Sequence, residues 1–130
     1  MTLLLDSSVL IDVLRLRIDR SEYLAGLIRT RKKLATTAIN LAEVYAGVRG
    51  SEASKLTELI QKLEVFAITP ELGRRGGLLK NEWARRGRTI ALDDALIAAV
   101  AIEYSLPLLT DNVRDFPMPE LQLWPLPRVQ

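Results

Sequence analysis

The chain has 130 residues, 48% of them apolar, which predicts a single domain over residues 1–130 with a core of its own. It contains no cysteine and no histidine, so disulfides, zinc fingers, cysteine nucleophiles and Ser-His-Asp triads are excluded, and any bound metal must be held by oxygen. The net charge is only +2, no apolar run is long enough for a membrane span, and the first residues lack the basic start of a signal peptide, so we expect a soluble cytoplasmic protein.

Short apolar runs alternate along the chain with longer segments in which apolar residues recur at helical spacing. The short runs predict buried strands, and the longer segments predict helices. In chain order we expect a strand at 2–5, helices at 7–16 and 20–31, a strand at 34–39, helices at 40–50 and 51–64, a strand at 65–68, a helix at 70–86, an almost wholly apolar helix at 93–104, and strands at 106–110 and 121–126. This alternation is typical of an α/β domain with a mostly parallel sheet.

The apolar helix at 93–104 begins with two adjacent aspartates. An aspartate can accept a hydrogen bond from the free N–H groups of a first helical turn, and this capping role accounts for one of the two. The other is then available for a binding site. We assign Asp93 to the cap and Asp94 to the site, and we expect Asn40 to cap the helix at 40–50.

Acidic residues recur where the expected strands end and the following helices begin. The set consists of Asp6, Glu43, Asp94, Asp111 and Asp115. Because the carboxyl ends of parallel strands meet at one edge of a sheet, topology alone brings these acids together. Crowded carboxylates repel one another, and a divalent cation supplies the compensating charge. Carboxylate-held Mg²⁺ or Mn²⁺ can activate water and stabilise phosphoryl oxygens, so phosphodiester hydrolysis is the predicted chemistry.

Each acid also has a purely structural interpretation. Asp6 can cap the helix that follows it, Glu43 can complement a helix dipole, and acids in a loop are usually just solvated. Each signal is weak by itself, and the prediction depends on the common placement of the acids.

Basic residues concentrate in GRRGGLLKNEWARRGRT (73–89), which contains one acid, Glu82. Arginine can hold a phosphate through two parallel hydrogen bonds, so Arg85, Arg86 and Arg88 are candidates for phosphate contact. The alternative is a solvated helix face whose charges only keep the helix in contact with water.

Four segments, LLLDSSVLID, INLAEVYAG, LDDALIAAVA and LLTDNVRDF, occur in this order over nearly the whole chain. Together they resemble the PIN-domain ribonucleases, and most closely the VapC-type toxins of prokaryotic toxin–antitoxin pairs. The resemblance implies a three-layer α/β/α sandwich, a homodimer, dependence on Mg²⁺ or Mn²⁺, and a cognate antitoxin that binds over the active site. It also implies an RNA substrate, often a tRNA or a ribosomal RNA.

Carried over position by position, the resemblance makes Asp6 and Asp94 the chief metal ligands, with Glu43 as a third acid. The family often places a fourth acid two residues after the threonine that ends the last strand, where this chain has Asn112. The N-x-x-D-F pattern points to Asp115, which we rank above Asp111. The predicted catalytic and metal-binding residues are Asp6, Glu43, Asp94 and Asp115, and the predicted RNA-binding residues are Arg85, Arg86 and Arg88.

Three other interpretations of these residues are possible. A phosphatase of the haloacid dehalogenase type needs a second aspartate where this chain has Ser8, and a receiver domain usually carries a lysine just after a late strand, where residues 111–114 contain none. A catalytically inactive PIN-like domain that only binds RNA or protein stays open. A nuclease assay with Mg²⁺ or Mn²⁺ against EDTA separates it from the predicted enzyme.

Overall fold

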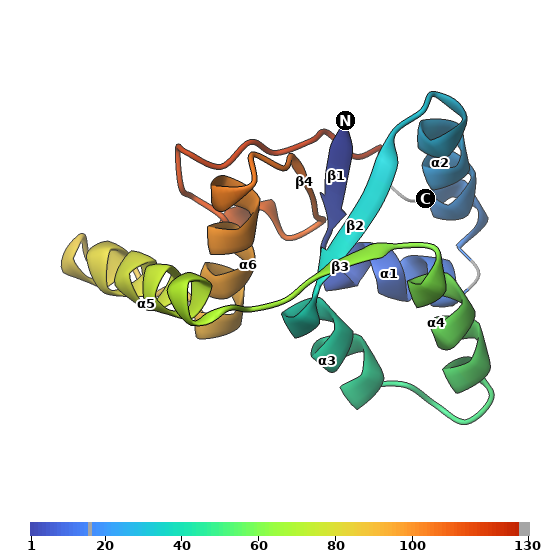
Figure 1. Cartoon of the computed structure of the whole chain (residues 1–130), viewed down its shortest axis with the longest axis horizontal. Helices are drawn as coiled ribbons and strands as arrows, with labels where there is room; N and C mark the ends of the chain where they lie inside the picture. The colour runs from blue at the N-terminus through green and yellow to red at the C-terminus, as the bar shows by residue number, and fades with distance from the viewer. Residues whose placement is uncertain (16, 128–130) are drawn as a thin grey trace.

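The computed structural model describes residues 1–15 and 17–127 and shows a parallel sheet between helices (Figure 1). The strands in this part of the chain are β1 (Thr2–Leu5), β2 (Lys33–Thr37), β3 (Glu64–Phe66) and β4 (Leu108–Leu109). They lie in the order β3-β2-β1-β4, and each neighbouring pair is parallel. The helices are α1 (Ser7–Leu14), α2 (Ile18–Arg29), α3 (Ala38–Ala46), α4 (Glu52–Gln61), α5 (Pro70–Arg85), α6 (Leu92–Glu103) and the short 3-10 helix η1 (Val113–Asp115).

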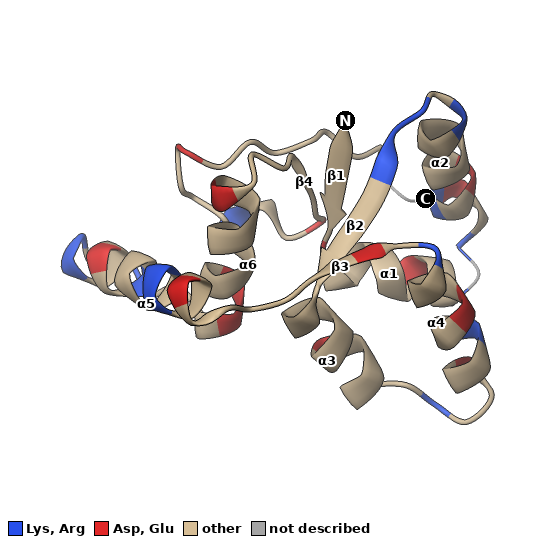
Figure 2. Cartoon of the chain, viewed as in Figure 1, with Lys and Arg blue, Asp and Glu red and all other residues tan. Residues whose placement is uncertain are grey.

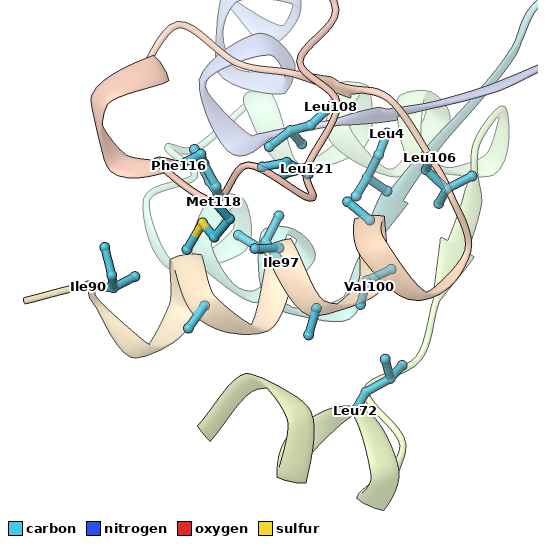
Figure 3. Close-up of a cluster of buried hydrophobic side chains, with 14 of the residues drawn as sticks. Leu4, Leu72, Ile90, Ile97, Val100, Leu106, Leu108, Phe116, Met118 and Leu121 are labelled. Atoms are coloured by element: carbon cyan, nitrogen blue, oxygen red, sulfur yellow. The ribbon is translucent and has the colours of Figure 1, made fainter. Parts of the chain in front are cut away.

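The two faces of the sheet bury separate sets of side chains, because successive residues of a strand point to opposite faces. Leu4 of β1 belongs to a cluster that includes Leu72 of α5 and Ile97 of α6 (Figure 3). Leu3 and Leu5 belong to a second cluster with apolar residues of α1, α2 and α4. In Figure 1, α5 and α6 lie on one side of the sheet, and α1, α2 and α4 lie on the other. The predicted α/β/α sandwich is confirmed.

Helix α6 is buried over most of its circumference, as its apolar sequence predicts. Its buried residues are Ala95, Ile97, Ala98, Ala99, Val100 and Ala101. Helix α5 packs closely against it because position 76 is glycine: a Cβ at Gly76 would lie 2.6 Å from Cδ2 of Leu96. The start of α6, where the two aspartates stand, is therefore held by dense packing.

Within the described residues, no helix is both long and apolar enough to cross a membrane.

The prediction of a strand at 121–126 is wrong. In the described residues this segment meets β4 only at an isolated bridge between Leu108 and Leu123. The backbone N–H of Trp124 still donates to the Leu108 carbonyl at 2.8 Å. In the described residues the pairing does not extend beyond this bridge into a ladder.

The second strand ends two residues earlier than expected, and this moves the start of α3. Thr37 is the N-cap of α3, and its hydroxyl accepts a hydrogen bond from the backbone N–H of Asn40 at 3.2 Å. The expected cap role of Asn40 is therefore wrong. Asn40 is the third helical residue, and its side chain completes the capping box by accepting a hydrogen bond from the backbone N–H of Thr37.

Candidate active site

Asp6 stands directly after β1 and has only 4% of its surface exposed. Each of its carboxylate oxygens accepts a hydrogen bond from a neutral side chain. Asn40 donates through Nδ2 to Oδ1 at 3.0 Å, and the Thr110 hydroxyl donates to Oδ2 at 2.6 Å. Burial raises the pKa of Asp6, and the hydrogen bonds from Thr110, the Ser7 backbone and Asn40 oppose that rise. The fold thus fixes this carboxylate in one orientation.

Glu43 lies in α3, and the Ser7 hydroxyl connects it to the surroundings of Asp6. This hydroxyl donates to Glu43 Oε1 at 2.7 Å and accepts from Asn40 Nδ2 at 3.0 Å. Partial burial, hydrogen bonding to Asp93 and the charges of Asp93 and Asp6 together raise the pKa of Glu43 to about 7, and the hydrogen bond from Ser7 opposes this rise. Glu43, Asp93 and Asp6 are therefore close enough to influence one another.

Asp93 lies beside Glu43 and does not cap α6, so the predicted cap role is wrong. The N-cap is Ala91, which has no side-chain acceptor, and both aspartates lie in the first helical turn. Asp93 Oδ1 accepts a hydrogen bond from the backbone N–H of Asp94 at 2.9 Å. Sequence reasoning missed Asp93 as a member of the site, although the adjacent pair of aspartates was the signal that could have identified it.

Asp94 and Asp115 line one hollow of about 260 Å³, and Arg88 and Arg114 line it with them. Burial and, to a smaller extent, the charges of Asp93, Asp115 and Asp6 together raise the pKa of Asp94 to about 7. Asp115 is exposed at the end of η1. The structure therefore places the predicted fourth acid next to Asp94.

Asp111, the alternative fourth acid, is held by a buried arginine. Arg20 of α2 has 1% of its surface exposed and donates through Nη2 to Asp111 Oδ1 at 2.9 Å. The same nitrogen lies 3.8 Å from Asp12 Oδ2. This ion pair engages Asp111, and the ranking of Asp115 above Asp111 as the fourth acid stays a prediction. Nothing local to the sequence around Arg20 indicates this role, because its partner is 91 residues away.

The three predicted RNA-binding arginines are all exposed but differ in their contacts. Arg88 donates to the backbone carbonyl of Arg114 and lines the hollow beside Asp94. Arg86 pairs with Glu82 at 2.7 Å and stacks on the Trp83 ring, while Arg85 ends α5. The structure therefore brings Arg88 to the acids, and it adds Arg114, which sequence reasoning did not select.

We define the acid cluster as Asp6, Glu43, Asp93 and Asp94. Figure 2 shows acidic segments on α3 and at the lower end of α6. In the described part of the chain, none of the ion pairs with lysine or arginine involves a member of this cluster. Carboxylate oxygens are the ligands that Mg²⁺ and Mn²⁺ prefer, so the donor type fits these ions.

The acid cluster does not form a complete cage for a metal ion. As the side chains stand, no three acids among residues 1–15 and 17–127 are close enough together to hold one ion. Mg²⁺ keeps several of its water molecules in proteins and is usually bound by only one or two carboxylates. Two acids of the cluster therefore suffice for such an ion.

Comparisons with known proteins agree with this architecture. The sequence profile described as "PIN domain" matches residues 3–117. Ribonuclease VapC19 of Mycobacterium tuberculosis is 37% identical over 120 residues, which cover 92% of this chain and 96% of that protein. Ribonuclease VapC10 of the same organism is 36% identical over 116 residues, covering 89% and 86%. The crystal structure of VapBC2 from Rickettsia felis bound to a promoter DNA fragment aligns with a TM-score of 0.84 at 26% identity, covering 95% of this chain and 98% of that one.

Proposed function

Because the chain belongs to the PIN-domain family, we propose that it is an endoribonuclease and the toxin of a toxin–antitoxin pair. Two relatives named ribonuclease VapC support this over nearly the full length of the chain. The observation that carries the proposal is the approach of Asp6, Glu43 and Asp94, which come from three separate segments, at the carboxyl edge of one sheet. We take residues 1–130 as a single nuclease domain.

In this proposal the enzyme uses Mg²⁺ or Mn²⁺, with Asp6 and Asp94 as the chief ligands. Glu43 and Asp115 complete the site, directly or through water. A bound ion would activate water and stabilise the phosphoryl oxygens of the substrate. The support for this assignment is electrostatic: the acid cluster has no cationic side chain paired with it in the described residues, so its charge is available to a cation.

Arg88 and Arg114 are proposed to hold the RNA backbone beside Asp94. An RNA strand that approaches the acid cluster meets like charge, and guanidinium groups next to the acids offset this repulsion. Both arginines line the hollow that Asp94 and Asp115 share. Arg85 and Arg86, at the end of α5, would extend the contact to neighbouring phosphates.

A cognate antitoxin and a second copy of the chain are the further proposed partners. The structural neighbour from Rickettsia felis is a VapBC complex, and it aligns with nearly the whole of this chain. By analogy, the antitoxin would bind over the acid cluster and block access for RNA. The homodimer rests on resemblance to the family.

The direct test is cleavage of total cellular RNA by purified protein with Mn²⁺, and with EDTA as the metal-free arm. Asp94→Asn should lower the cleavage rate by at least about a hundredfold, which is typical for loss of a group that stabilises developing charge. Asp19→Asn makes the same chemical change at an exposed position of α2 and should cleave as the wild type does. Full activity of Asp94→Asn, with a circular dichroism spectrum like that of the wild type, would end the assignment.

The second candidate is a PIN-like domain that binds RNA or protein without cleaving it. The incomplete cage is the observation that favours it, because no three acids of the described residues converge on one point. RNA that stays intact with Mn²⁺ while still binding the wild-type protein would establish this function in place of the nuclease.

A further inference from the structure

Asn40 connects the start of α3 with two residues of the acid cluster. Its side chain is fully buried. Oδ1 accepts hydrogen bonds from the Thr37 backbone N–H at 3.2 Å and from the Thr37 hydroxyl at 2.7 Å. Nδ2 donates to Asp6 Oδ1 and to Ser7 Oγ, each at 3.0 Å. One amide thus serves a helix cap at one end and the acid cluster at the other.

Hydrogen-bonding chemistry fixes which way this amide points. The backbone N–H of Thr37 can only donate, so it requires the oxygen end of the Asn40 side chain. The nitrogen end carries two donors and meets two acceptors, Asp6 and Ser7. If the amide were flipped, its NH₂ group would face the backbone N–H of Thr37, and its oxygen would face the carboxylate oxygen of Asp6. Neither pair can form a hydrogen bond, and unsatisfied polar groups in the core are costly, so the flipped orientation is excluded.

The effect of Asn40 extends to a second acid through Ser7. Because Nδ2 of Asn40 donates to Ser7 Oγ, the lone pair on that side of the hydroxyl is occupied and its proton is free for Glu43 Oε1 at 2.7 Å. Asn40 therefore orients Asp6 directly and Glu43 through one hydroxyl. An amide orients the acids without adding positive charge, so their negative charge stays available for a cation. A lysine or arginine at position 40 would instead neutralise part of that negative charge.

We propose that Asn40 is a positioning residue that sets the metal affinity of the acid cluster. This inference rests on the proposed function, because it assumes that Asp6 and Glu43 serve a divalent cation. Residues that orient metal ligands through hydrogen bonds typically contribute about 10- to 100-fold in metal affinity. A residue that served only as part of a helix cap would affect folding and leave metal affinity unchanged.

The test is calorimetric titration of Mn²⁺ into wild-type protein, Asn40→Ala and Asn40→Ser. Alanine removes both donors, and serine supplies one donor where Asp6 and Ser7 need two. Both variants should bind Mn²⁺ about 10- to 100-fold more weakly, and excess Mn²⁺ should restore RNA cleavage. Serine keeps a polar group at this buried position, so it carries the test should the alanine variant fail to fold.

The matched control is Thr69→Ala, which removes the hydroxyl that caps α5 by accepting from the Leu72 N–H at 3.2 Å. This control should lower the melting temperature and leave Mn²⁺ affinity as in the wild type. Unchanged Mn²⁺ affinity in the folded Asn40 variants would overturn the role of Asn40 while the nuclease proposal stands. A wild-type protein that neither binds Mn²⁺ nor cleaves RNA would overturn the proposed function, and this inference with it.

Discussion

Asp6 and Asp94 belong to the same acid cluster but differ in their burial and in the groups that surround them. Asp6 is buried, and neutral donors from Asn40 and Thr110 hold both of its oxygens. Asp94 is half-buried in the first turn of α6, and the charges of Asp93, Asp115 and Asp6 contribute to its raised pKa. The fold has therefore fixed the geometry of Asp6 in advance, whereas Asp94 is left with uncompensated repulsion. In our account, a bound cation relieves that repulsion.

The two sides also differ in what surrounds them. The Asp6 side is a closed network in which Asn40, Ser7 and Glu43 are linked by hydrogen bonds. The Asp94 side opens into the hollow lined by Arg88 and Arg114, where a substrate phosphate could enter. Changes to Asn40 or Ser7 on the closed side should therefore act on metal affinity, and changes to Arg88 or Arg114 on the open side should act on RNA binding.

The larger of two further effects is expected on the open side, from Arg114→Ala. Loss of one phosphate contact should weaken RNA binding several-fold at low salt and reduce the slope of log affinity against log salt by about 0.7. Filter binding of a short RNA to the Asp94→Asn background measures this without cleavage. Arg29→Ala, an exposed arginine of α2, is the matched control and should leave the slope unchanged. Equal slopes for Arg114→Ala and the wild type would remove Arg114 from the RNA-binding surface.

A smaller effect is expected on stability, from the raised pKa values of Glu43 and Asp94. Both pKa values are raised to about 7 from ordinary values of 4.5 and 3.8. Between about pH 4 and pH 7 the native state therefore holds protons that the unfolded chain has released, so the stability of the metal-free protein should fall as the pH rises through this range. Urea denaturation at several pH values in EDTA measures the fall. Asp94→Asn should make the profile flatter, and a profile as steep as that of the wild type would contradict the shift assigned to Asp94.

Much of the fold was predictable because its signals are local. The apolar run at 2–5 and the periodic segments gave strands and helices in the right order, and parallel topology then placed Asp6, Glu43 and Asp94 at one edge. The expected strand at 121–126 was wrong because, in the described residues, this segment pairs with β4 at a single bridge and not along a ladder. The functional roles of the acids stay a prediction.

The parts of the site that escaped prediction depend on contacts between distant residues. The ion pair that engages Asp111 comes from Arg20 and spans 91 positions, so no local pattern indicates it. The link between Asn40 and Asp6 spans 34 positions. For Asp93, the pattern of apolar residues located the first turn of α6 but not its N-cap, which is Ala91. A shift of two residues changed a presumed cap into a neighbour of Glu43.

The central claim is that carboxylates from separate segments share a divalent cation, and calorimetric titration of Mn²⁺ into metal-free protein tests it most directly. The account predicts saturable binding to the wild type and to Asp19→Asn, and loss of that binding in Asp6→Asn, whose amide retains the size of the side chain without its charge. No saturable binding to the wild type, or equal affinity in Asp6→Asn, would contradict it.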